Sequence, residues 1–269
     1  MIVVKKQVEN MKLSSKRNLT PYEKTQLAKY QIPLGKALNQ PDLPIEYLTG
    51  WVDFAGLTLK IDQRALIPRV ETEELVTLAT QYIFENPKKP DQCWQIADIG
   101  TGCGAMTLAI AHNLAPTNQA FKILATDISI EALELAKLNA RQLKLAETIE
   151  FKQLDLLTKL PANYQVFDLI TANLPYIPTG RIAQLDKSVG AYEPLVALDG
   201  GPDGFSLIEK FLNQAESKIK PTGLILLEID YSHPDLLKNK FCHAWQIKTW
   251  TSQQSRCIFA QLRKKIPLA

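Results

Sequence analysis

The stretch Val-Phe-Asp-Leu-Ile-Thr-Ala-Asn-Leu-Pro-Tyr-Ile-Pro occupies residues 166–178 and joins an apolar run to a polar motif. Five of its first six residues are apolar or β-branched. This composition is typical of a strand that is buried on both faces. The stretch therefore predicts a core strand that delivers a polar turn at its end.

The motif after this strand, Asn173-Leu174-Pro175-Tyr176, offers the groups that can hold a planar –NH2 group. The side-chain oxygen of Asn173 and the carbonyl of Leu174 can each accept one amine hydrogen. Pro175 donates no backbone N–H and biases Leu174 toward an extended conformation, while Tyr176 can stack on a flat amide or base. Such a site would leave the nitrogen lone pair directed at an electrophile. An ordinary turn at the end of a strand is the alternative.

Alternating strand and helix patterns around this stretch predict an α/β fold with a doubly wound, mostly parallel, Rossmann-like sheet. The expected strands are residues 94–99, 121–126, 149–154, 166–171, 224–229, 246–250 and 257–262. The expected helices are residues 105–114, a helix capped by Ser129, a helix near 204–219 and a helix with Thr72 as its N-cap. Pro221-Thr222-Gly223 is expected to form a turn before its strand.

The residues before the sheet predict a small helical region at 1–45 and a hairpin linker at 46–70, which leaves 71–269 for the main domain. Thr20-Pro21-Tyr22-Glu23 has the pattern of a helix start, and Gly56 lies between two short alternating runs. Residues 1–36 carry eight basic and two acidic side chains. We interpret them as a solvated helical arm, with a basic face for an anionic partner as the alternative.

The composition is that of a soluble globular protein, with 269 residues, 46% hydrophobic and 22% charged residues and a net charge of +3. No apolar run approaches the roughly 20 residues of a membrane helix, and no signal peptide is recognisable, so a cytoplasmic protein is expected. The four cysteines include no Cys-x-x-Cys pair and there are three histidines. No metal site is therefore expected, and Cys242-His243 are interpreted as buried core residues.

A glycine-rich loop, Gly100-Thr101-Gly102-Cys103-Gly104, lies between a predicted strand and a predicted helix. Glycine at such positions lets a ligand approach the backbone closely. Asp127 ends the next strand, where its carboxylate can accept both hydroxyls of a ribose. A dinucleotide would also satisfy the looser glycine pattern. The Asn-Leu-Pro-Tyr motif suits methyl transfer to an –NH2 group, and hydride transfer has no use for it, so S-adenosylmethionine is the predicted cofactor.

Together these stretches resemble the class I S-adenosylmethionine-dependent methyltransferases and, more specifically, the HemK-type peptide chain release factor glutamine N5-methyltransferases. The resemblance covers roughly residues 45–230, and two of its stretches, Ile-Pro-Arg-x-Glu-Thr-Glu and Glu-Pro…Leu-Asp-Gly-Gly, are the specific ones. The shared parts are Tyr47-Leu-Thr-Gly50, Leu66-Ile-Pro-Arg69, Glu71-Thr-Glu73, Ile99–Gly104, Thr126-Asp-Ile-Ser-x-Glu-Ala132, Asn173-x-Pro-Tyr-Ile-Pro178, Glu193-Pro194 and Ala197-Leu-Asp-Gly-Gly-x-Asp-Gly204.

The resemblance implies an enzyme that methylates the side-chain amide nitrogen of the glutamine in the Gly-Gly-Gln loop of a release factor, with the N-terminal region helping to dock that factor. A monomer is expected. Residues 100–104 would cradle the methionine end of S-adenosylmethionine and Asp127 would hold its ribose. Asp155 and Leu156 would border the adenine. Asn173 would lie against both cofactor and substrate. The Leu174 carbonyl would orient the glutamine amide with Asn173, and Pro175 and Tyr176 would shape its slot.

Three residues depart from the family pattern. Leu174 and Val70 each stand where the family usually has proline, and Asp230 stands where it commonly has glycine. Asn-Leu-Pro-Tyr also resembles the motif of ribosomal RNA adenine N6-dimethyltransferases, and the basic arm would suit RNA. RNA (or DNA) adenine methylation is therefore the alternative function, although a DNA enzyme would need a further recognition domain. A non-catalytic binding protein with a methyltransferase fold is the third.

Overall fold

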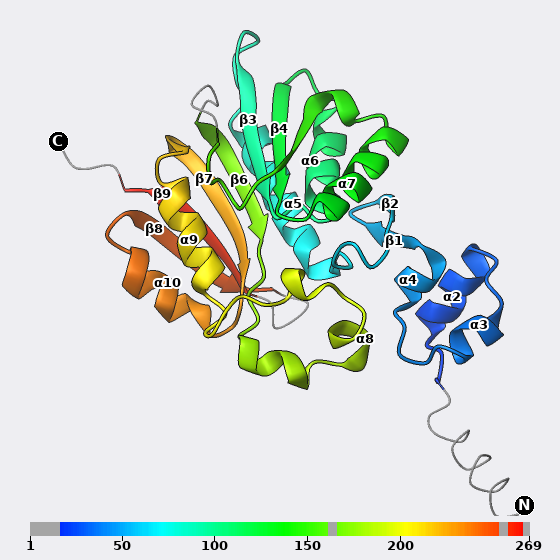
Figure 1. Ribbon diagram of the computed structural model, residues 1–269. Helices are drawn as coiled ribbons and strands as arrows, with labels where there is room; N and C mark the ends of the chain where they lie inside the picture. The colour runs from blue at the N-terminus through cyan, green and yellow to red at the C-terminus, as the bar shows by residue number, and fades with distance from the viewer. Residues whose placement is uncertain (1–16, 161–165, 253–257, 266–269) are drawn as a thin grey trace, which may run out of the picture.

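A twisted sheet of seven strands with helices on both faces forms the body of the molecule in the computed structural model, which describes residues 17–160, 166–252 and 258–265 (Figure 1). The spatial order is β5-β4-β3-β6-β7-β9-β8. Their bounds are β3 (Cys93–Ile99), β4 (Ala120–Asp127), β5 (Ile149–Gln153), β6 (Phe167–Asn173), β7 (Ile219–Ile229), β8 (Trp245–Thr251) and β9 (Ile258–Lys264). β3 to β7 pair in parallel, and β9 is antiparallel to β7 and β8. The predicted doubly wound, mostly parallel sheet is confirmed.

Three earlier helices pack on one face of the sheet and two later helices pack on the other. α5 (Glu73–Glu85), α6 (Ala105–Leu114) and α7 (Ile130–Gln142) share one buried cluster, and α9 (Ser206–Ala215) and α10 (His233–Phe241) share the other. Successive residues of β6 serve opposite clusters, with Leu169 in the first and Ile170 in the second. The near-continuous apolar run of β6 is therefore explained by burial on both faces.

Most expected caps and turns are confirmed, but the cap at Thr72 and the turn at 221–223 are wrong. Ser129 caps α7, because the N–H of Ala132 donates to its hydroxyl at 3.0 Å. Thr72 makes no capping hydrogen bond at the start of α5, and its hydroxyl donates instead to Glu228. β7 runs through residues 221–223 without ending there, because an irregularity in its pairing with β6 absorbs the extra residues. The sequence patterns also did not predict α10.

The N-terminal residues fold into three short helices followed by a hairpin. These are α2 (Pro21–Lys29), α3 (Leu34–Leu38), α4 (Ile45–Thr49), β1 (Trp51–Phe54) and β2 (Leu57–Lys60). Thr20 and Glu23 form the capping box expected from the sequence. The hairpin predicted around Gly56 is confirmed, and Gly56 has a φ of 79° in its turn. The three helices enclose a small cluster of buried side chains of their own, Leu27, Ala37, Ile45 and Leu48.

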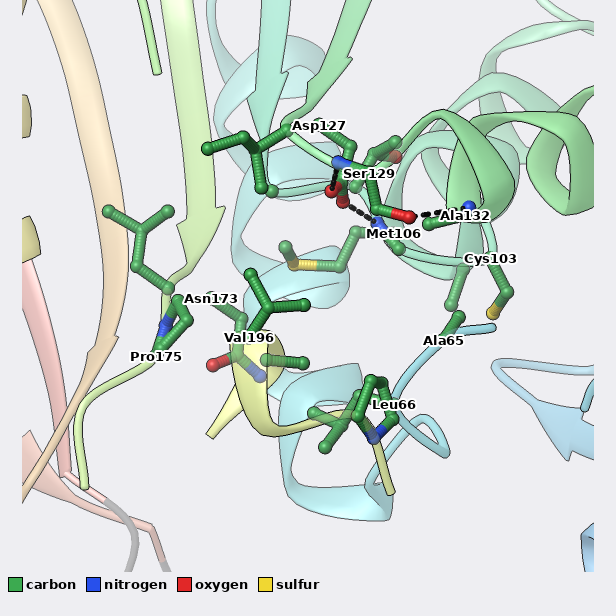
Figure 2. A pocket seen from close by; sticks show the side chains of 18 of the residues that line it. Ala65, Leu66, Cys103, Met106, Asp127, Ser129, Ala132, Asn173, Pro175 and Val196 are labelled. Atoms are coloured by element: carbon green, nitrogen blue, oxygen red, sulfur yellow. Dashed lines mark hydrogen bonds between the residues drawn. The ribbon is translucent and has the colours of Figure 1, made fainter. Parts of the chain in front are cut away.

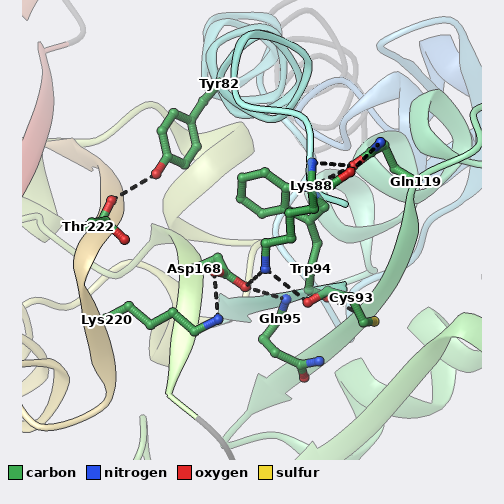
Figure 3. A network of polar contacts seen from close by, with 9 residues as sticks. All are labelled: Tyr82, Lys88, Cys93, Trp94, Gln95, Gln119, Asp168, Lys220 and Thr222. Carbon is green, nitrogen blue, oxygen red and sulfur yellow. Dashed lines mark hydrogen bonds and ion pairs between the residues drawn. The ribbon is translucent and has the colours of Figure 1, made fainter. Parts of the chain in front are cut away.

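A buried ionic cluster fixes the beginning of β6 (Figure 3). The carboxylate of Asp168 pairs with the ammonium groups of Lys88 at 2.6 Å and Lys220 at 2.7 Å, and it accepts the backbone N–H of Gln95 at 2.8 Å. A buried carboxylate is tolerated only with such partners. The cluster anchors β6 to β3 and β7 at the end of the sheet opposite Asn173.

Cys242 and His243 are exposed just after α10, which contradicts their expected burial. Within the described ranges no helix combines the length and the apolar character that crossing a bilayer requires.

Candidate active site

A cavity of about 250 Å³ opens at the carboxyl ends of β3, β4 and β6 (Figure 2). In doubly wound sheets, ligands bind at this edge, where the strand order reverses. Ten of the sequence-predicted site residues line the cavity: Gly100, Thr101, Gly102, Cys103, Asp127, Asp155, Leu156, Asn173, Leu174 and Pro175. The other two, Gly104 and Tyr176, do not line it. The glycine loop and the Asn-Leu-Pro-Tyr motif therefore face one space.

The glycine loop has a backbone that other residues rarely adopt. The φ angles of Gly100, Gly102 and Gly104 are 73°, 56° and 88°. The N–H groups of Gly100 and Thr101 both donate to the carbonyl of Thr126, at 2.8 and 2.9 Å. A Cβ on Gly100 would lie 3.1 Å from the side chain of Leu174. The loop is thus packed tightly onto the Asn-Leu-Pro-Tyr motif.

Asp98 supports this loop from beneath the cavity. Its side chain is fully buried and accepts hydrogen bonds from the hydroxyls of Thr101 at 2.8 Å, Thr107 at 2.7 Å and Thr171 at 2.9 Å. Burial raises the pKa of Asp98, although the three hydroxyls favour its ionised form. Asp98 ties β3, the loop, α6 and β6 together at one point.

The Asp127 carboxylate lies at the rim of the cavity and is held by backbone groups (Figure 2). One oxygen accepts the N–H of Gly102 at 2.8 Å and the other accepts that of Ser129 at 2.9 Å. Desolvation raises the pKa of Asp127. A carboxylate oxygen can accept more than one hydrogen bond, so each retains capacity for a ligand hydroxyl. This arrangement fits a ribose.

The predicted adenine border is shaped by two different residues. Asp155 is about half exposed and forms an ion pair with Lys210 of α9. Leu156 has a φ of 59°, and its carbonyl accepts the hydroxyl of Thr126 at 3.3 Å. The apolar side chain of Leu156 is thereby held at the cavity wall, beside an exposed acidic group.

Asn173 and Tyr176 converge on a buried carboxylate that the sequence patterns did not single out. Asn173 donates from its amide nitrogen to Glu228 at 3.1 Å and to the Thr72 hydroxyl at 3.2 Å. Tyr176 donates from its hydroxyl to Glu228 at 2.8 Å. Glu228 lies opposite Asn173 in the pairing of β6 with β7. Two sequence signals could have pointed to Glu228: its position at the end of a predicted core strand, and its place just before the Asp230 departure from the family pattern.

Backbone hydrogen bonds join the Leu-Asp-Gly-Gly stretch to the loop that contains Asn-Leu-Pro-Tyr. The N–H of Ile177 donates to the carbonyl of Leu198 at 3.1 Å, and the N–H of Gly200 donates to the carbonyl of Ile177 at 2.9 Å. A Cβ on Gly200 would lie 2.7 Å from the carbonyl oxygen of Pro175. Only glycine permits this approach, which explains why the two stretches occur together.

Asp230, which stands where the family commonly has glycine, forms local contacts beside Glu228. It pairs with Arg181 and accepts the N–H and the hydroxyl of Ser232 at 2.9 and 2.6 Å. These partners hold the pKa of Asp230 low against the opposing effect of its burial. The backbone N–H of Asp230 donates to the imidazole of His233 at 3.2 Å. Asp230 therefore links the end of β7 to the start of α10 through its bonds to Ser232 and His233.

Comparison with known sequences places the chain in one family. A family model described as a methyltransferase domain matches residues 91–266. A release factor glutamine methyltransferase of Lactococcus lactis is 41% identical over 198 residues, which cover 74% of this chain and 67% of that protein. One from Moorella thermoacetica is 38% identical over 196 residues, covering 73% and 65%. Across the first four such relatives the match spans between 61% and 68% of their own length.

Solved structures share the fold at low sequence identity. The catalytic domain of human Mettl16, bound to an RNA hairpin, superimposes with a TM-score of 0.61 at 15% identity, covering 80% of this chain and 78% of that one. A ribosomal protein L11 methylase from Lactobacillus delbrueckii gives a TM-score of 0.52 at 21% identity, covering 75% and 82%. Through its sequence relatives and its matching domain, the chain belongs to the release factor glutamine methyltransferases of the methyltransferase family.

Proposed function

We propose that this protein transfers the methyl group of S-adenosylmethionine to the side-chain amide nitrogen of the glutamine in the Gly-Gly-Gln loop of a peptide chain release factor. The orientation of Asn173 carries the proposal. Its –NH2 group is occupied by Glu228 and Thr72, so its side-chain oxygen is the end left to accept from a substrate amide in the cavity. The names of the sequence relatives support the choice of release factor as acceptor.

The residues of the cavity fit S-adenosylmethionine. The loop of residues 100–104 would hold the methionine end, because its positive φ angles suit glycine and no protein atom lies within 4 Å of the position that a Cβ on Gly102 would take. Asp127 would accept the ribose hydroxyls with the oxygens that Gly102 and Ser129 orient. Asp155 and Leu156 would border the adenine. When bound, the cofactor supplies an electrophilic methyl group on a sulfonium sulfur.

The protein's own contribution would be to position a weak nucleophile. The lone pair of an amide nitrogen is delocalised, and the proposed mechanism therefore uses geometry in place of a strong base. Asn173 and the Leu174 carbonyl would accept the two amide hydrogens, and Pro175 and Tyr176 would shape the slot. Effective molarities on the order of 10⁵ M or more are available to well-oriented reactants. The two acceptors would also stabilise the positive charge that develops on the nitrogen.

We further propose a division of the chain into the helical region 1–45, the hairpin linker 46–70 and the methyltransferase domain 71–269. The helical region would help to dock the release factor. The protein would act as a monomer in the cytoplasm. Gel filtration of the full chain, alone and with a release factor, tests the oligomeric state and the docking, and a dimer would contradict the former.

The function is tested by incubating the purified protein and S-adenosylmethionine with two acceptors side by side. One acceptor is an unmethylated release factor and the other is unmethylated small-subunit ribosomal RNA. Mass spectrometry should find one added methyl group on the glutamine of the Gly-Gly-Gln peptide. The matched variant Asn173→Ala should lower this rate by about 10²-fold, the scale for loss of one preorganised polar group. Methylated adenine in the RNA would establish the alternative function, and cofactor binding without any transfer would favour a binding protein.

A further inference from the structure

A chain of hydrogen bonds runs from a buried carboxylate to the amide of Asn173. The side chain of Glu228 is 1% exposed at the end of β7. One of its oxygens accepts from the Thr72 hydroxyl at 2.7 Å and from the Asn173 amide at 3.1 Å. The other accepts from the hydroxyl of Tyr176 at 2.8 Å. Both ends of the carboxylate are thus directed at residues that border the proposed substrate.

The number of protons that each group can donate determines the direction of these hydrogen bonds. A carboxylate has only acceptors, and a threonine hydroxyl has a single proton. Thr72 gives that proton to Glu228, so only its lone pairs face the Asn173 nitrogen, 3.2 Å away. Asn173 must therefore present its –NH2 group to both neighbours. Its oxygen, on the opposite side of the planar amide, is left for the cavity that Asn173 lines.

We infer that Glu228 is a positioning residue that, together with Thr72, locks the Asn173 amide in the orientation that can accept a hydrogen bond from the substrate. The inference rests on the proposed function for its catalytic meaning. Without this lock the two ends of the amide are nearly equal in shape. A flipped Asn173 would present –NH2 to the –NH2 group of the acceptor, and two donors cannot bond to each other.

Glu228→Gln tests the lock with almost no change in volume. Tyr176 would still donate to the side-chain oxygen of the introduced glutamine, so the new –NH2 group would face Thr72 and Asn173. Thr72 and Asn173 would then have to accept hydrogen bonds where they now donate them. We expect kcat to fall by about 10²-fold, with little change in the dissociation constant of S-adenosylmethionine. Glu209→Gln is the matched control, because Glu209 is an exposed residue of α9 paired with Lys240. It should leave kcat and cofactor affinity unchanged.

Thr72 supplies a second pair of variants. Thr72→Val removes the hydroxyl at constant shape and should lower kcat, whereas Thr72→Ser keeps the hydroxyl and should retain more activity than the valine variant. A side chain that merely supported the fold would give the opposite order, because valine preserves the packing of threonine better than serine does. Equal kcat values for the two variants would also contradict the inference.

The side-chain amide signals of Asn173 in a ¹H–¹⁵N spectrum, identified by their absence in Asn173→Ala, provide a readout without any acceptor. In the wild type one amide proton should be shifted downfield by its bond to the carboxylate, and Glu228→Gln should abolish that shift. An unchanged spectrum, or an unchanged kcat, would overturn the inference. If the wild type methylates no release factor, the proposed function fails, and the spectrum still decides the orientation of Asn173.

Discussion

The guanidinium of Arg69 lies 2.5 Å from the carboxylate of Glu193, although 124 positions separate the two residues in the chain. The side chain of Glu193 is only 1% exposed, and its second oxygen accepts the N–H of Ile67 at 3.4 Å. The two stretches that are most specific to the family therefore meet in one ion pair. Burial raises the pKa of Glu193, and Arg69 opposes that rise.

Arg69→Met should destabilise the fold by about 3 kcal/mol, near the lower end for breaking a buried pair, because Arg69 itself is one-third exposed. The uncompensated Glu193 carboxylate is the physical cause. Urea denaturation at pH 7.5 measures the effect. The loss should shrink as the pH falls, because burial raises the pKa of Glu193 and a Glu193 that has taken up a proton needs no partner. Arg64→Met is the matched control, since the exposed pair of Arg64 with Asp62 contributes at most about 1 kcal/mol. Equal losses in the two variants would contradict the assignment.

Asp127→Asn should weaken S-adenosylmethionine binding by about tenfold or more, the scale for hydrogen bonds to a charged group. The new –NH2 group would face the N–H of Gly102 or Ser129 and turn the side chain away from the ribose. Isothermal titration calorimetry measures the dissociation constant. Asp155→Asn should have a smaller effect, because Asp155 is about half exposed and paired with Lys210. A wild-type affinity in Asp127→Asn would remove Asp127 from the ribose role.

Gly204→Ala should lower both stability and turnover. Gly204 has a φ of 76°, and an added Cβ would overlap the carbonyl oxygen of Tyr176 and lie 3.0 Å from the backbone of Pro178. Such overpacking costs about 1–3 kcal/mol, and it would displace the loop that carries Pro175 and Tyr176. Thermal unfolding and kcat test this. Gly180→Ala, where nothing lies within 4 Å of the added carbon, should change stability by less than about 0.5 kcal/mol. A tolerated alanine at 204 would show that the loop is not held there.

His233 should make the fold less stable as the pH falls. Its ring is buried, with Nδ1 accepting from the N–H of Asp230 and Nε2 donating to the carbonyl of Asp203 at 3.2 Å. Burial lowers the pKa of His233 below 6.5. The unfolded state therefore binds a proton that the folded state does not, and stability is lost as the pH falls through 6.5 toward the folded pKa.

Urea denaturation at pH 8 and pH 5.5 measures this contribution of His233. In His233→Asn the loss of stability on acidification should be smaller than in the wild type, because no buried imidazole has to be protonated. The matched variant His243→Asn alters an exposed residue and should keep the wild-type loss. An identical pH dependence in both variants would contradict the prediction.

Local patterns sufficed for much of the fold, because each rests on neighbouring residues. The helix at 105–114 and the capping hydroxyls of Thr20 and Ser129 are set within a few positions of the chain. The strand at 166–171 was recognisable because burial on both faces demands apolar residues at successive positions. The glycine loop was recognisable because three positive φ angles require glycine.

The sequence by itself determined the alternating strands and helices, the glycine loop and the strand that ends in Asn-Leu-Pro-Tyr, each of which depends on residues along a short segment. Only the tertiary structure decided the partners of those elements. Thr72 lacks a capping role because its backbone is already helical, and its hydroxyl bonds instead to Glu228, 156 positions away. The orientation of the Asn173 side-chain amide is set by Glu228, which the parallel pairing of β6 with β7 places beside it. Hydrogen bonds act over about 3 Å of space, and distance along the chain carries no information on which distant residues are brought that close.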